Sequence, residues 1–236
     1  AVYAFRALPP IKTGLEIFVY ICQIPWVIYN LALITRSSQD GPLYFCPEFV
    51  PLLLNYTITI GGITNIIWLF LWSGQKLVAE VCVLAAITLI VTFGNIWTIR
   101  KLVLLQQNLN WDVILTRLFV HNGIIMLQEY FWLSLCGHIG LVVSVEIGMV
   151  KADAETLALA LMAVVVVVDG IILAFAWDRY VRYLFGTFIV DIWYFSSIID
   201  YNFDSSERNS IIAILLLVLT FIFLFGIGGL TGLFLG

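Results

Sequence analysis

Charge is scarce in this chain of 236 residues: only 11% of them are Asp, Glu, Lys or Arg, whereas 62% are hydrophobic. A typical soluble domain is about one-quarter charged and about half apolar. The mean hydropathy of +1.06 points in the same direction. The composition therefore excludes an ordinary soluble protein. It predicts an all-α, polytopic helical bundle that is integral to a membrane and forms a single domain over residues 1–236.

Several functional classes lack the residues that they need. The net charge is −4 and no basic run is present, so we expect no nucleic-acid partner. The four cysteines include no C-x-x-C pair, which argues against a zinc site or a redox pair. His121 and His138 are 17 residues apart without a His or Cys partner at ligand spacing, so no metal is expected. All four lysines lie at the ends of hydrophobic segments or in loops, which excludes a retinal Schiff base.

Long apolar segments fill most of the chain. A membrane span needs roughly 20 mostly apolar residues, and seven segments approach this requirement. Charged residues dilute the sixth segment, and without it the count is six. The fourth begins with a polar stretch over 102–119, which we expect to approach along the interface before a span from about His121. The predicted spans are 14–35, 49–72, 77–99, 112–145, 156–177, 181–200 and 210–235.

An amide and two indoles interrupt the second apolar segment. Asn65, Trp68 and Trp72 are spaced by three and four residues, so they share one stripe of a helix. An unpaired amide in hydrocarbon costs several kcal/mol. We therefore expect the protein or a bound ligand to receive it. Further aromatic and polar groups inside the spans complete the candidate ligand-binding residues: Trp26, Asn30, Asn65, Trp68, Gln128, Glu129 and Trp132.

Three acidic residues fall inside predicted spans and suggest an alternative function. Glu129 lies near mid-span, Asp169 interrupts a run of five valines, and Asp191 lies in the sixth segment. An acid at this depth is protonated, paired, or faces a wet cavity. The functional interpretation is proton coupling by Glu129, Asp169 and Asp191. The structural interpretation is a neutral acid that hydrogen-bonds to a neighbouring helix.

Three stretches resemble the TspO family, the translocator or tryptophan-rich sensory proteins, and especially its longer relatives. Residues 18–31 are similar to the first-span pattern of the long members, and Asn65-Ile66-Ile67-Trp68 matches the family's Asn-x-x-Trp. Arg117-Leu118-Phe119 with Asn122-Gly123 is weakly similar to the start of the family's fifth helix. The resemblance covers residues 14–145 and implies a TspO-like core with additional helices over 156–235. Known members bind porphyrins, sterols or related flat ligands between helices, which implies a cavity lined by Trp26, Asn30, Asn65, Trp68 and Trp132.

These observations favour a non-enzymatic membrane protein that binds an apolar conjugated or polycyclic ligand within its bundle. A carotenoid, a tetrapyrrole and a sterol are the candidate ligands, and the first two would be pigments. The alternatives are a proton-coupled small-molecule transporter and a structural subunit of a membrane assembly. The expected partners are the lipid bilayer, the apolar ligand, and further copies or subunits of a membrane complex.

Overall fold

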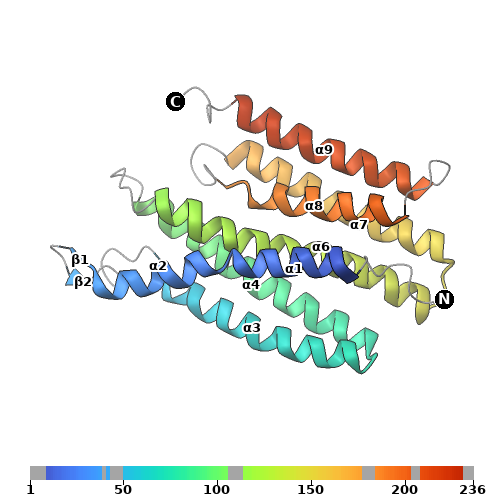
Figure 1. Ribbon diagram of the computed structural model, residues 1–236, viewed down its shortest axis with the longest axis horizontal. Helices are drawn as coiled ribbons and strands as arrows, with labels where there is room; N and C mark the ends of the chain where they lie inside the picture. The colour runs from blue at the N-terminus through green and yellow to red at the C-terminus, as the bar shows by residue number, and fades with distance from the viewer. Residues whose placement is uncertain are drawn as a thin grey trace.

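The computed structural model describes residues 9–38, 41–42, 50–105, 114–176, 184–202 and 208–230 of the chain. They form an all-α bundle of long helices, with α6 between the α3–α4 pair and the group α7, α8 and α9 (Figure 1). In chain order the described elements are α1 (Pro9–Ile21), α2 (Ile24–Thr35), β1 (Ser37–Ser38), β2 (Gly41–Pro42), α3 (Leu52–Ser73), α4 (Leu77–Leu105), η1 (Thr116–His121), α6 (Asn122–Val145), α7 (Lys151–Ala176), α8 (Gly186–Asn202) and α9 (Arg208–Leu230). The two short strands pair antiparallel with each other.

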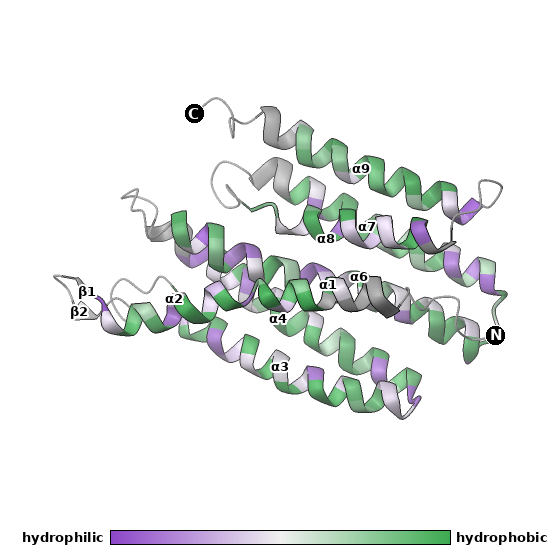
Figure 2. Cartoon of the chain, viewed as in Figure 1, coloured by the Kyte–Doolittle hydropathy of each residue, from purple (hydrophilic) through white to green (hydrophobic). Residues whose placement is uncertain are grey.

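Six helical segments of the described chain are long and apolar enough to cross a membrane. Their outward faces carry exposed aliphatic and aromatic side chains, which gives the helices their largely hydrophobic colouring in Figure 2. A water-soluble bundle would cover such faces with polar residues. The protein is therefore an integral membrane protein, as the sequence predicted. The six segments are 17–35, 52–73, 77–101, 116–145, 151–172 and 208–226.

The predicted 181–200 segment corresponds to α8, which has only 17 residues and is not among these six. Its neighbours nevertheless require it to cross the bundle. Arg208 at the start of α9 lies 3.2 Å from Asp153 at the start of α7, so α7 and α9 begin at the same end and run parallel. The chain between them must return, and α8 does so in contact with α6 and α9 (Figure 1). Because neighbouring helices cover most of α8, its surface need not be apolar all round.

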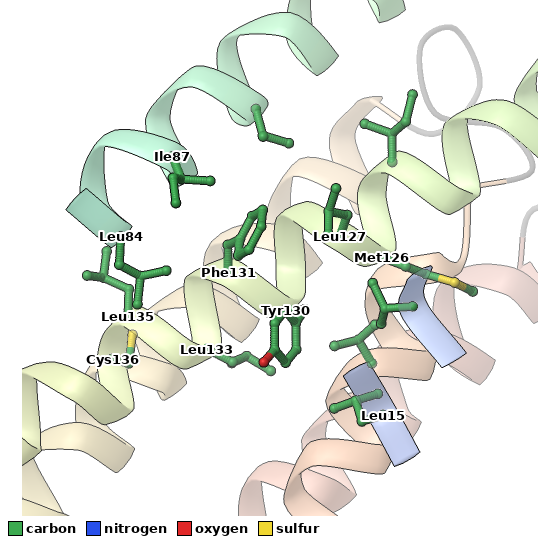
Figure 3. Packing of buried hydrophobic residues seen from close by; sticks show 14 of the residues in the cluster. Leu15, Leu84, Ile87, Met126, Leu127, Tyr130, Phe131, Leu133, Leu135 and Cys136 are labelled. Atoms are coloured by element: carbon green, nitrogen blue, oxygen red, sulfur yellow. The ribbon is translucent and has the colours of Figure 1, made fainter. Parts of the chain in front are cut away.

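α6 is the central helix of the bundle. About 72% of its spanning window is buried, against 11–33% for the other five spans. Figure 3 shows Phe131 on the side of α6 that faces Leu84 and Ile87 of α4, and Tyr130 on the side toward Leu15 of α1. A helix that is apolar on all sides is suited to such a central position. Functional groups on α6 are therefore held among other helices and not against lipid.

The chain that leads into α6 differs from the interfacial segment that the sequence predicted. α4 continues to Leu105, and η1, a π-helical segment, runs directly into α6 and belongs to the same 30-residue span. Arg117 and His121 of η1 are buried, so an interfacial approach through residue 119 is wrong for this part. The polar residues 106–113 of the predicted approach lie outside the described residues. The cause of the error is tertiary: η1 packs against α2 and α6, and its polar side chains are buried in the bundle.

The first span is broken into α1 and α2 at Cys22 and Gln23. Pro25 lies at the second position of α2, and because it lacks an N–H it cannot donate the hydrogen bond to the carbonyl oxygen of Ile21 that a continuous helix would contain. The side-chain Nε2 of Gln23 donates to the carbonyl oxygens of Val19 at 3.1 Å and Gly123 at 2.7 Å. The break thus fastens the N-terminal helices to α6.

Candidate functional site

Within the described part of the chain, the seven predicted ligand-binding residues make their contacts in several different places. Trp26 and Asn30 line a groove next to α3, and Asn65 bonds to α1. Trp68 and Glu129 belong to two separate buried clusters, described below. The last two, Gln128 and Trp132, join α6 to α4.

The α4–α6 contacts have a structural character. Asn95 donates from Nδ2 to Oε1 of Gln128 at 2.9 Å, and the indole Nε1 of Trp132 donates to Oγ1 of Thr92 at 3.2 Å. Hydrogen bonds of this kind hold transmembrane helices together with about 0.6–2 kcal/mol each. Gln128 and Trp132 therefore have protein partners that account for their polarity without a ligand.

A groove of about 460 Å³ lies beside α2 and α3 and is open along one side. Asn55 donates from Nδ2 to Oδ1 of Asn30 at 3.3 Å across this groove, and Asn30 donates in turn to the carbonyl oxygen of Trp26 at 2.9 Å. The indole Nε1 of Trp26 and Oδ1 of Asn55 are buried and have no hydrogen-bond partner among the residues that the structure describes. The groove is lined by Trp26, Val27, Asn30, Leu31, Ile34 and Asn55.

A second amide contact joins α3 to α1. Asn65 of α3 donates from Nδ2 to the hydroxyl of Tyr20 of α1 at 2.7 Å, and Oδ1 of Asn65 is buried without a partner in the described part of the chain. The predicted stripe of Asn65, Trp68 and Trp72 is thus divided. Asn65 turns to α1, while the two indoles turn to α6.

Those two indoles enclose a buried pair of ionisable groups. The Nε1 of Trp68 donates to Oε1 of Glu80 at 3.0 Å, and Nδ1 of His138 lies 3.1 Å from the same oxygen. The imidazole of His138 stacks on both Trp68 and Trp72, with ring centroids 5.6 and 5.1 Å apart. Sequence reasoning missed Glu80, which the structure shows to be only 1% exposed. The available signal was an acid in the first turn of an otherwise apolar helix.

We expect Trp68→Phe to lower the free energy of unfolding by about 1–3 kcal/mol, because Glu80 loses a buried charge-assisted donor. The change can be measured by reversible unfolding in mixed micelles. Trp97→Phe is the matched control, because Trp97 is exposed on the lipid-facing side of α4. Equal stability of the two variants would show that the indole N–H is unimportant.

The three predicted proton-coupling acids meet in the bundle. Glu129 comes from α6, Asp169 from α7 and Asp191 from α8, and the side chain of Glu129 hydrogen-bonds to both aspartates. Glu129 and Asp191 are 0% and 1% exposed, whereas Asp169 is half-buried. We call these three residues the carboxyl cluster. At 1.5 Å per residue, Asp169 lies about 10 Å before the end of α7, so the cluster lies inside the membrane but nearer one end of the bundle.

The carboxyl cluster can form only if some of its carboxyl groups are protonated. An ionised carboxylate is an acceptor only, so each hydrogen bond between two carboxyl groups contains a proton. Within the part of the chain that the structure describes, both oxygens of Glu129 and Asp191 and Oδ2 of Asp169 lack any other hydrogen-bond partner. Two such bonds to Glu129 therefore require at least two protons and leave at most one negative charge among the three carboxyl groups. Three bare charges at this depth would be far more costly.

Neither the carboxyl cluster nor the histidines form a metal site in the described ranges, where no group of three His, Cys, Asp or Glu side chains has suitable geometry. His121 is 1% exposed and lies one turn after Arg117 in η1. His138 contacts Glu80 and the indoles of Trp68 and Trp72. The two histidines thus belong to different environments.

Comparisons of the chain with protein-family models, with curated proteins and with solved structures returned no match.

Proposed function

We propose that this integral membrane protein is a proton-coupled carrier of small molecules and that the carboxyl cluster is its proton-binding centre. The observation that carries the proposal is the meeting of Glu129, Asp169 and Asp191 from three different helices. Ionisable residues inside membrane spans are costly, and they mark proton relays in pumps and transporters. A purely structural contact between helices needs one neutral polar pair, whereas this centre brings together three acidic groups that can share and exchange protons.

The different burial of the three acids suggests the direction of exchange. Glu129 and Asp191 are enclosed, and Asp169 is the half-buried member. Asp169 is therefore the group through which a proton enters or leaves the cluster, and Glu129 is the group that shares protons with both aspartates. A shift of α7 relative to α6 would separate Asp169 from Glu129 and change the number of bound protons. This coupling of helix position to proton occupancy is what a carrier needs.

The test uses the purified protein in liposomes that contain a pH-sensitive dye. A panel of neutral and cationic small solutes is added across a pH gradient, and solute-dependent proton movement is recorded. Asp169→Asn is expected to reduce that movement to the level of protein-free liposomes, because a carboxamide does not act as an acid or a base near neutral pH.

Asp153→Asn is the matched control, since Asp153 is an exposed acid at the beginning of the same helix. It is expected to leave proton movement unchanged. Undiminished movement in the Asp169→Asn variant, or no proton movement with any solute, would refute the proposal.

A further inference from the structure

The groove beside α2 and α3 contains two unsatisfied polar atoms of opposite kind. Nε1 of Trp26 can only donate a hydrogen bond, and Oδ1 of Asn55 can only accept one. Each is buried without a partner in the structure, although buried polar atoms are paired in the great majority of cases. Their own neighbours are already engaged, since Asn30 accepts from Asn55 and donates to the backbone of Trp26. A ligand that both donates and accepts would satisfy them.

The rest of the groove restricts the chemistry of that ligand. Its remaining lining side chains are Val27, Leu31 and Ile34, and no charged residue is among the six that line it. A phosphate or ammonium headgroup would therefore find no counter-charge here. The three aliphatic side chains are also exposed on the bundle surface, which faces lipid in a membrane protein. The ligand is thus uncharged, has an apolar body, and enters sideways from the bilayer.

The position of the amides suits a molecule that is anchored near the membrane surface. Asn55 is three residues into α3 and Asn30 is five residues before the end of α2, so both lie within about 8 Å of a helix end. Trp26 lies one turn deeper along α2. α2 packs on η1 rather than closely along α3, which leaves the groove open. A head at the amides and a tail directed past the indole would follow the usual orientation of a bilayer amphiphile.

We infer that this groove binds a neutral lipid alcohol with a single apolar tail. The hydroxyl donates to Oδ1 of Asn55, its oxygen accepts from Nε1 of Trp26, and the tail packs on the indole and on Val27. A hydroxyl is the smallest uncharged group that supplies both a donor and an acceptor. The proposal is independent of the carboxyl cluster, which lies on α6, α7 and α8.

The test uses geranylgeraniol and its methyl ether as probes, with the protein in phosphatidylcholine nanodiscs. Both compete against a diazirine-tagged long-chain alcohol, and the labelled peptides are mapped by mass spectrometry. The ether accepts but cannot donate, so it loses only the bond to Asn55. We expect the alcohol to compete about tenfold better than the ether, and labelling to fall on the groove residues.

Substitutions in the groove test which residues bind the hydroxyl. Trp26→Phe keeps an aromatic ring without the N–H, and it is expected to weaken the binding of the alcohol about five- to tenfold. In Asn55→Leu the preference for alcohol over ether should disappear, because the acceptor that distinguishes the two probes is gone. Trp97→Phe, at an exposed indole of α4, should bind like the unaltered protein. Asp169→Asn should also bind normally, which separates this inference from the proposed carrier function.

Equal competition by the alcohol and the ether in the unaltered protein would overturn the inference and show only non-specific lipid occupancy. This comparison requires no substitution, so it does not depend on the folding of any variant. A preference for alcohol that persists in Asn55→Leu would also overturn it.

Discussion

Glu129→Gln is expected to remove the proton-holding capacity of the carboxyl cluster while keeping the fold. Glu129 is the member that hydrogen-bonds to both Asp169 and Asp191, so its replacement affects both shared protons. Glutamine has nearly the same shape, and its amide can still donate to one aspartate, but it carries no exchangeable acid. Proton movement by the reconstituted protein should fall to the level of protein-free liposomes.

Difference infrared spectroscopy provides a direct measurement, because protonated carboxyl groups absorb separately from carboxylates. The absorption of protonated acid should decrease strongly in Glu129→Gln and stay unchanged in Glu146→Gln, which alters an exposed acid just beyond the end of the same helix. An unchanged band in Glu129→Gln would mean that the cluster does not share protons in the way proposed.

The all-α membrane fold was predictable because the signal is local. Each spanning helix must satisfy its backbone hydrogen bonds internally and face hydrocarbon, so about 20 apolar residues in sequence are sufficient to locate it. The prediction was least secure for α8, whose lipid exposure is limited by α6, α9 and α1. A helix that is covered by other helices does not need a continuous apolar surface, so hydropathy alone does not identify it as a span. The parallel arrangement of α7 and α9 is what shows that α8 crosses the bundle.

The candidate site was harder to predict because partners are a tertiary property. The polarity of Gln128 suggested a ligand contact, and the structure adds that its Oε1 accepts a hydrogen bond from Asn95 of α4, while its role in ligand binding stays a prediction. Glu80 was overlooked, although it organises Trp68 and His138. The three acids of the alternative hypothesis were each identified from sequence, and the structure brings them together. Their role in proton coupling stays a prediction, as does the resemblance to the TspO family.

Gly123→Ala is expected to produce the largest loss of stability among single methyl additions to the helices. A Cβ at Gly123 would fall against the backbone carbonyl oxygen of Cys22, and a backbone atom cannot move aside as a flexible side chain can. The contact is further fixed because Gln23 donates to the carbonyl oxygen of Gly123 at 2.7 Å. Relief therefore requires the break between α1 and α2 to move away from α6. We expect a destabilisation of about 3 kcal/mol, at the upper end of the usual cost of overpacking.

Gly62→Ala is the matched control on α3, where an added Cβ would meet no atom within 4 Å. Alanine is the better helix former, so this variant should be unchanged or up to about 1 kcal/mol more stable. Unfolding in mixed micelles gives the two free energies, and amide hydrogen exchange shows where Gly123→Ala acts. Faster exchange confined to α1 and α2 is expected, because the clash lies at their junction while the contacts of α6 with α4 and α7 remain. Equal stability of the two alanine variants would mean that the N-terminal helices are not held tightly against α6, and that the groove beside α2 is not a rigid site.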